Sequence, residues 1–444
     1  MGGLLVALVG ACSLVWLGDL RLAVPQTIAI MLIWGGAVCL LPKPTALEGR
    51  WGRAGGLSNT CWVFCAALVV RGVLLLSPAT LSDDIYRYLW EGWVVWQGGN
   101  PYLVPPGSQV WAGQLEPSWD AIRMLVNHPD VSAAYPPLTL VGFASVVGLG
   151  GGAFVVKLLM GAADAAIAWV VADILQGRRR PLTGAWLLAI HPLCVVESAG
   201  SGHFDSLALL LLVVGIRAWD RGDVGAGWVA LGGMIKLLPF LILPATLSAG
   251  LKARPRMPGV WLGLAVGIVL GLSLLPFRGG GWASLEGLKT YGTVWAFNGS
   301  IYPLVAMGLG AWARPILILL GGGLVLWVWR HRRDPAEAAF LIGGAFVLLS
   351  PTVHPWYVMW AWVPAIIVGN RSWTLLATLI PLSYAALASY NPDTSLWSAP
   401  WWPPVVIYLS FFVALMLECR SHWTLPGPWA TRRSEAALRS PFRI

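Results

Sequence analysis

The chain has little charge for its length. Only 11% of its 444 residues are Asp, Glu, Lys or Arg, whereas 57% are hydrophobic and the mean hydropathy is +0.71. Soluble globular proteins carry about 25% charged residues, so this chain could not cover a water-exposed surface with the charge that it holds. Disordered chains and coiled coils also need abundant charge. The composition therefore predicts an all-α polytopic membrane protein.

Several motifs of soluble enzymes are absent from the sequence. It has no P-loop, no GxGxxG after a strand and no HExxH, so we expect no cytoplasmic nucleotide substrate. Its six cysteines lie in or beside apolar runs without the paired spacing of a metal site, which is typical of small core residues. We expect no cofactor, and a divalent metal, although possible, is not indicated.

The positive charge is confined to short clusters between apolar runs. The net charge of +9 would indicate nucleic-acid binding in a soluble protein, but this placement is typical of the positive-inside rule. We therefore expect no nucleic-acid partner, and we place these clusters in the cytoplasm. They are Lys43, Arg50 and Arg53; Arg178 to Arg180; Lys252, Arg254 and Arg256; Arg330, Arg332 and Arg333; and Arg432 and Arg433.

Apolar runs long enough to form membrane helices recur along the chain. They predict about 11–14 membrane segments in a single domain over 1–420, followed by a cytoplasmic basic tail over 421–444. The first run lacks a basic leader and a small-residue cleavage site, so we expect it to stay uncleaved. The predicted runs are 3–18, 25–42, 59–78, 138–150, 153–175, 182–199, 204–219, 226–248, 258–276, 313–329, 336–350, 357–369, 373–390 and 403–418.

A long polar stretch interrupts these runs at 79–137. The positive-inside count places it outside the cytoplasm, and so long a loop is usually functional. The same count fails in the middle of the chain, where full crossings by 138–150 and 153–175 would put Arg178 on the wrong face. The run 226–248, which holds Lys236, has a similar problem. We therefore expect half-spanning or broken helices, which are tolerated where they line a cavity.

Glu197 and Asp205 are the only charged residues in the run 182–216, and His191 and His203 flank them in HPLCVVESAGSGHFDSL. Ionisable groups in apolar segments are costly and indicate function by default. Asp205 could instead cap the second helix, so both interpretations stay open.

An acidic pair follows the third run in TLSDDIYRYLWEG. Asp83 and Asp84 repel one another, so one of them could have a raised pKa and act as a base. Alternatively, together with Ser82, they cap an amphipathic helix, and the two roles are compatible.

Isolated polar groups raise similar alternatives elsewhere. Lys236 could reach toward the membrane surface or face a phosphate, while His354 stands at an outer boundary among aromatic residues that could anchor the interface. Lys157 and Asp164 share a helical face, so mutual pairing is expected. The ionisable groups converge where four segments would meet: 79–137, 200–205, 277–302 and 351–357.

The ordered motifs SDDIYRYLWEG, GGNPY, YPPLTL, KLLMGAADAAIA, HPLCVVESAGSGHFDSL, GGMIKLLPFLILP and SPTVHPWYVMW resemble those of GT-C glycosyltransferases. The layout is similar to polyprenyl-phosphate-mannose-dependent mannosyltransferases, such as the catalytic subunit of GPI mannosyltransferase I and bacterial alpha-mannosyltransferases. The resemblance covers residues from about 60 to 370.

This resemblance implies inverting transfer of a hexose, mannose first, from a polyprenyl-phosphate donor to a glycolipid or glycan hydroxyl. The site would lie on the extracytoplasmic face of a bacterial plasma membrane, in contact with membrane lipids. Asp83 or Asp84 would be the general base, and we assign substrate binding to Arg87, Glu91, His128, Tyr135, Glu197, His203, Asp205, Lys236, Asn298 and His354.

Three alternatives remain open at this point. A GT-C enzyme could use another lipid-linked sugar, such as glucose, galactose or arabinose. A secondary transporter would also place charges in broken helices, although no inverted repeat is evident. A structural or chaperone-like membrane subunit would not need so many ionisable residues at one face.

Overall fold

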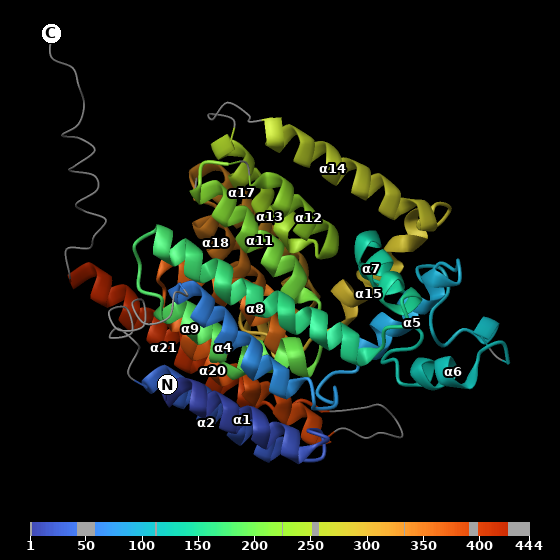
Figure 1. The fold of residues 1–444 in the computed structure, drawn as a ribbon, viewed down its shortest axis with the longest axis horizontal. Coiled ribbons are helices and arrows are strands. Elements are labelled where there is room, and N and C mark those ends of the chain that lie inside the picture. Colours follow the sequence, from blue (N-terminus) through green and yellow to red (C-terminus); the bar gives the residue numbers. More distant parts are fainter. Residues whose placement is uncertain are drawn as a thin grey trace, which may run out of the picture.

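The computed structural model describes residues 2–41, 58–111, 113–223, 225–250, 257–332, 334–389 and 398–424. Within these ranges the regular elements are helices. In addition, residue 352 forms isolated β-bridges with residues 297 and 298. Figure 1 shows the helices packed side by side, with α5, α6, α7 and α15 gathered on one side of the bundle. The main helices of the first half are α1 (Gly2–Leu17), α2 (Val24–Leu40), α4 (Asn59–Leu74), α5 (Asp84–Trp96), α6 (Pro117–Met124), α7 (Pro137–Gly148), α8 (Ala153–Gly177), α9 (Thr183–Ile190), α10 (Pro192–Val195) and α11 (Asp205–Asp220).

The second half continues with helices of very different lengths. They are α12 (Ala226–Ile235), α13 (Leu238–Gly250), α14 (Met257–Leu274), α15 (Glu286–Val294), α16 (Ile301–Leu309), α17 (Ala313–His331), α18 (Pro335–Leu349), α19 (Met359–Val368), α20 (Ser372–Leu379) and α21 (Trp402–Thr424).

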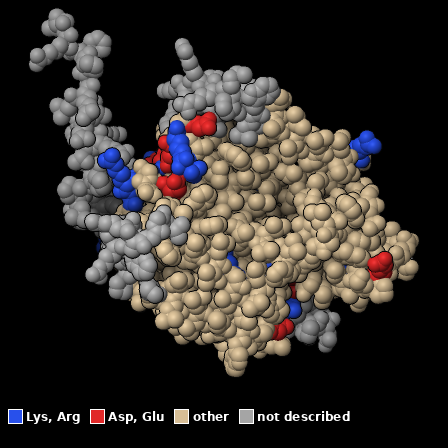
Figure 2. Space-filling model, viewed as in Figure 1, with Lys and Arg blue, Asp and Glu red and all other residues tan. Residues whose placement is uncertain are grey.

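Four helical segments are long and apolar enough to cross a membrane, and a bent pair, 263–277 with 281–294, adds a broken one. Eight shorter apolar helices accompany them among the described residues. Figure 2 shows one face of the molecule, which is mostly uncharged, with its few charged groups in small clusters or standing alone. The all-α polytopic membrane fold is thus confirmed, while the number of spans stays a prediction. The tail beyond residue 424 and the basic loops at 43–53 and 252–256 lie outside the described residues.

The broken helices expected in the middle of the chain are present. The run 226–248 divides at Lys236, whose extended backbone (φ −143°, ψ 133°) separates α12 from α13. The 12 residues of α7 extend only about 18 Å at 1.5 Å per residue, which is less than the bilayer core. Arg178 accordingly lies beside the basic cluster at 330–332, because its Nη1 is 3.0 Å from Oδ2 of Asp334.

One predicted span has the wrong boundary. The run 313–329 was expected to follow an outer loop over 277–302, but the apolar helical segment already begins at Ile301 and continues to His331. Gly310, with φ 53°, bends it between α16 and α17. Positive φ is easily adopted by glycine, so a bend of this kind is hard to see in a continuous apolar pattern.

A buried ion pair joins α4 to α8. Nε of Arg71 donates to Oδ2 of Asp164 at 2.9 Å, and both residues are 2% exposed. The guanidinium also donates to the carbonyl oxygens of Leu188 and Ala189, at 3.1 and 2.7 Å. Pro192 has no N–H for the carbonyl of Leu188, so Arg71 satisfies backbone groups that the break between α9 and α10 leaves free.

The expected pairing of Lys157 with Asp164 is wrong. Lys157 Nζ instead donates to the carbonyl oxygens of Leu74, Leu75 and Ser77, beyond the end of α4. The two side chains share one face of α8, but seven residues along a helix correspond to about 10.5 Å. Asp164 therefore pairs with Arg71 within α4, whereas Lys157 binds carbonyl groups at and beyond the end of α4.

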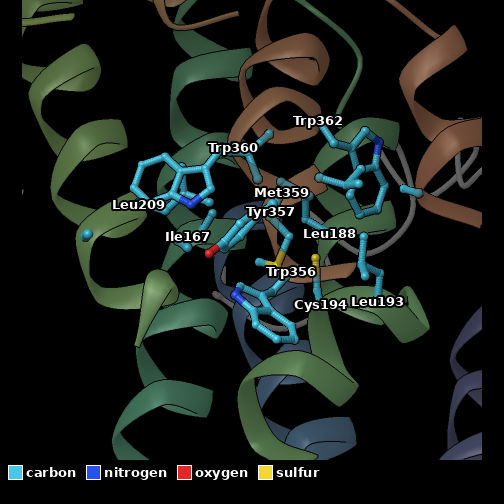
Figure 3. Packing of buried hydrophobic residues seen from close by; sticks show 14 of the residues in the cluster. Ile167, Leu188, Leu193, Cys194, Leu209, Trp356, Tyr357, Met359, Trp360 and Trp362 are labelled. Atoms are coloured by element: carbon cyan, nitrogen blue, oxygen red, sulfur yellow. The ribbon is translucent and has the colours of Figure 1, made fainter. Parts of the chain in front are cut away.

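The centre of the bundle is aromatic. The segment from Pro355 through α19 enters it, and Figure 3 shows Trp356, Tyr357, Trp360 and Trp362 packed among aliphatic side chains of neighbouring helices. Trp360 and Trp362 are fully buried. Burial of such large rings stabilises the bundle and holds the polar residues at its edge in fixed positions.

Removing one member of the Arg71–Asp164 pair would leave a buried charge without a partner. We expect D164A to lower the free energy of unfolding by about 3–5 kcal/mol, measured by thermal unfolding in detergent. R221Q is the matched control, because Arg221 pairs with Asp173 but is 56% exposed, and it should cost less than about 1 kcal/mol. Equal losses in the two variants would contradict this interpretation.

Candidate active site

The acidic pair lies where the chain leaves α4 and enters α5. The Ser82 hydroxyl accepts from the backbone N–H of Asp84 at 3.3 Å, and α5 begins at Asp84, so the predicted helix start is confirmed. The side chain of Asp83, at the N-cap position, makes no cap bond, so its expected part in the cap is wrong. The two carboxylates then diverge. Asp83 Oδ1 accepts from Arg21 Nη1 at 2.9 Å, in the turn between α1 and α2. Burial raises the pKa of Asp83; Arg21 opposes this shift and Asp84 adds to it.

Asp84 faces the opposite way, toward the bundle. Its Oδ1 accepts from Nδ2 of Asn127 at 3.1 Å, and its Oδ2 lies 3.9 Å from Nε2 of His203. The carboxylate is 23% exposed, whereas the imidazole is 1% exposed. Asp84 is therefore the member of the pair that combines solvent access with a contact to the candidate site.

His203 is held between two carboxylates. Its Nδ1 lies 3.2 Å from the backbone carbonyl oxygen of Glu197, its hydrogen-bond partner, and 3.1 Å from Oε2 of the same residue. Oε1 of Glu197 accepts from the hydroxyl of Tyr384. The backbone creates this geometry: Val196–Gly200 forms one turn of π-helix, and Gly202, with φ 77°, turns the chain back so that the N–H of His203 reaches the carbonyl of Glu197 at 3.0 Å. Single π-turns are frequent at functional sites.

Trp356 separates two histidines in a ring stack. Its centroid lies 3.6 Å from that of His203 and 4.5 Å from that of His354. Trp356 is only 7% exposed, so the interfacial anchoring expected for this residue is wrong. Burial lowers the pKa of His354 to about 4, so its ring is neutral at pH 7 and offers a hydrogen bond rather than a charge.

Lys236 pairs with Asp205 at the break between α12 and α13. Nζ lies 2.7 Å from Oδ1 and 2.8 Å from Oδ2 of Asp205, and Trp360 Nε1 donates to Oδ1 at 2.7 Å. The capping role for the Asp205 side chain is wrong, because α11 has no side-chain cap bond. Lys236 does not reach away from the bundle: Nζ lies 5.0 and 4.9 Å from the ring centroids of Phe204 and Tyr357.

Arg87 and Glu91 hold the polar loop together. Arg87 donates to the carbonyl oxygens of Asn127, His128 and Val131 and to Oε1 of Glu91. Glu91 is 1% exposed and its Oε2 has no hydrogen-bond partner. These groups support the loop that carries Asn127 rather than face Asp84 directly.

Other predicted residues lie around this centre. Tyr135 packs its ring edge-on against Phe204 at 4.9 Å, and His128 meets Trp295 in the same manner at 4.6 Å. Asn298 donates to the carbonyl of Val353 at 3.2 Å, and its Oδ1 is buried without a partner. The predicted convergence of the four segments is therefore confirmed, while the role of each residue is a separate question. Among the described residues, no three His, Cys, Asp or Glu side chains gather as a metal ion requires.

The sequence pattern did not reveal Arg21, Asn127 or Tyr384. Arg21 stands in GDLRL between the first two apolar runs, a signal that a search for charges outside the cytoplasm could have found. Asn127 and Tyr384 are uncharged, and nothing in their neighbourhood distinguishes them.

Two family models together match most of the chain. The model for the alpha-(1->6)-mannopyranosyltransferase N-terminal domain matches residues 2–251, and the MptB C-terminal domain matches residues 290–420. The chain belongs to this alpha-(1->6)-mannopyranosyltransferase family. It is a glycosyltransferase of the membrane, and the resemblance to bacterial GT-C mannosyltransferases is confirmed.

The named relatives in this mannopyranosyltransferase family have low sequence identity to the chain, but the alignments cover most of it. Alpha-(1->6)-mannopyranosyltransferase A of Mycobacterium tuberculosis is 24% identical over 85% of this chain and 78% of its own length. Alpha-(1->6)-mannopyranosyltransferase B of Corynebacterium glutamicum is 24% identical over 67% of this chain and 57% of its own length. No solved structure matches.

Glu91 predicts a pH effect on the stability of this mannosyltransferase. Burial raises its pKa from 4.5 to about 7, against the opposing effect of Arg87. Between these values the folded protein binds more protons than the unfolded one, so stability falls as pH rises. We expect E91Q to flatten the decline in thermal stability from pH 5 to pH 8, whereas E116Q, at an exposed position, should keep it. An equally steep decline in E91Q would contradict the assignment.

Proposed function

We propose that this protein transfers a mannosyl group from a polyprenyl-phosphate donor to a hydroxyl group of a glycan acceptor, forming an α-(1→6) linkage on the extracytoplasmic face. The observation that carries the proposal is the divergence of the acidic pair: Arg21 binds Asp83, while Asp84 faces His203. The linkage follows the names of the relatives. The proposed acceptor hydroxyl approaches Asp84 from the loop side.

Asp84 is the proposed general base. A carboxylate within reach of the attacking hydroxyl removes its proton as the new bond forms. Asp83 cannot take this place without leaving the guanidinium of Arg21 at 2.9 Å. Asn127 holds one oxygen of Asp84 at 3.1 Å and thereby orients the other toward the site.

His203 and Glu197 support the base from behind. Nε2 of His203 and Oε2 of Glu197 are both buried and without a hydrogen bond, although Nδ1 of His203 lies 3.1 Å from that same oxygen. In the proposed reaction the proton taken by Asp84 passes to Nε2 of His203, and the Glu197 carboxylate stabilises the imidazolium that forms. The buried surroundings strengthen this interaction.

Lys236 is the proposed cation for the leaving phosphate. Negative charge grows on the polyprenyl phosphate as its bond to the sugar breaks, and a fixed cation stabilises that transition state. Lys236 is 22% exposed while its partner Asp205 is 3% exposed. The two carboxylate oxygens take two of the three ammonium donors, which leaves one donor for the phosphate. The neutral ring of His354 adds a hydrogen bond. No metal ion takes part in this scheme.

The proposed chemistry is a single displacement with inversion. Base and cation belong to different segments, α5 and the α12–α13 break, with the sugar between them. A donor with β configuration then gives an α-linked product. The lipid tail stays in the bilayer, so the donor enters laterally from the membrane and the acceptor from the loop side.

The two aspartates should respond differently to the same substitution. D84N is expected to reduce transfer of radiolabelled mannose by about 10²–10⁴-fold, because the amide cannot accept the proton. D83N keeps the shape of the side chain and should retain most of the activity. Purified protein in detergent, polyprenyl-phosphate mannose and a glycan acceptor are sufficient for this assay. A dead D83N beside an active D84N would reverse the assignment of the base.

Replacing Lys236 tests the leaving-group site. K236M should raise the KM for the donor and lower kcat, together by about 10²-fold in kcat/KM, whereas K236R keeps the positive charge and should restore part of the rate. The KM for the acceptor should stay near that of the wild type. A loss confined to acceptor kinetics would show that Lys236 does not serve the phosphate.

A further inference from the structure

A cavity of about 380 Å³ opens beside the candidate site, between the segment around 102–132 and α15. Tyr102, Asp130 and Ser132 line one side, and Glu286 and Thr290 line the other. None of these residues belongs to the base or to the phosphate site proposed above. One wall belongs to the second arm of the bent pair 263–277 with 281–294. Asp130 and Glu286 are exposed, so a water-borne ligand can reach the cavity.

The walls of this cavity are fixed by close backbone contacts. A Cβ on Gly287 would overlap the carbonyl oxygens of Ser132 and Ala133, so α15 lies directly against the loop at this point. The N–H of Ala133 in turn donates to the carbonyl of Pro101 at 3.0 Å. The floor is also held, because the hydroxyl of Tyr102 donates to the carbonyl of Tyr135 and Tyr102 is 6% exposed.

The chemistry of the lining selects a class of ligand. Asp130 and Glu286 supply carboxylates, and Ser132 and Thr290 supply hydroxyl groups, while the described lining contains no basic residue. Glu286 also pairs with Lys289, whose Nζ lies 3.3 Å from Oε1 outside the lining. The two carboxylates still leave the cavity without net positive charge, which disfavours phosphates and other anions, and they accept hydrogen bonds from hydroxyl groups. Leu103 and Pro105, which also line the cavity, offer apolar contact for the faces of a sugar. This combination suits a neutral ligand rich in hydroxyl groups.

The cavity is connected to the candidate active site on both sides. Thr290 precedes Tyr291, whose hydroxyl lies 2.6 Å from that of Tyr357, next to the Trp356 on which His203 stacks. On the loop side, Val131 also lines the cavity, and its carbonyl oxygen accepts from Arg87. Arg87 lies about one turn along α5 from Asp84.

We propose that this cavity is an acceptor subsite that binds a neutral oligosaccharide, holding sugar residues other than the one that receives mannose. The inference rests on the proposed transfer reaction and deepens it by naming the acceptor class. Sugars bound in the cavity fix the acceptor chain, so that the attacking hydroxyl is presented to Asp84. The enzyme should then prefer extended acceptors over a single sugar.

The experiment compares methyl α-mannoside with an α-(1→6)-linked mannotetraose as acceptors. The wild type should show a higher kcat/KM for the tetraose. T290W fills the cavity, and D130N/E286Q removes its charges; both should lower the rate with the tetraose more than the rate with the monosaccharide. T293W is the matched control, because Thr293 lies on the same helix at an exposed position outside the lining. It should keep the preference for the longer acceptor.

Binding of the tetraose in the absence of donor is measured by saturation-transfer NMR. This measurement distinguishes the proposed subsite from the proposed transfer reaction. Binding by the wild type that is lost in T290W but kept in T293W supports the subsite, even if no transfer is seen with this donor. Absence of transfer with bound tetraose would overturn the proposed reaction alone. Transfer without any length preference, or binding unaffected by T290W, would overturn the subsite alone.

Discussion

The contact between Asp84 and His203 joins the polar outer segment to the helical bundle, and the other features of the site depend on it. His203 can take this position because Glu197 and Trp356 fix its ring from two directions. Asp84 can take its position because Arg21 holds its neighbour Asp83 apart. An acidic pair that is adjacent in the chain is thereby separated into one carboxylate with a cation and one with an imidazole.

Broken helices make this arrangement possible in a chain that is otherwise apolar. Each break frees backbone groups that need partners, and the bundle supplies them with side chains. Arg71 donates to a carbonyl group at the break before Pro192, and Lys157 donates to a carbonyl group at the end of α4. At a third break, Lys236 lies beside Asp205 and retains partial exposure. Arg71 and Lys157 thus bind backbone carbonyl groups, whereas Lys236 is the cation that we propose for the leaving phosphate.

The sequence was sufficient to predict which polar segments meet, but not how their side chains pair. Charges are so rare in this chain that those outside the cytoplasm indicate a site by their presence alone. Pairing depends instead on which helix stands opposite, as Lys157 and Asp164 show by choosing different partners on α4. The choice between the two aspartates likewise depends on Arg21, 62 residues away along the chain, and local spacing contains no trace of that contact.

A double-mutant cycle on Asp84 and His203 tests the central claim most directly. The kcat/KM for mannosyl transfer is measured for the wild type, D84N, H203Q and the double variant. If the two residues act as one unit, the double variant should be little slower than D84N alone, because the relay has no function once its base is lost. Losses that multiply independently would show that His203 supports the site by another route and would contradict the account.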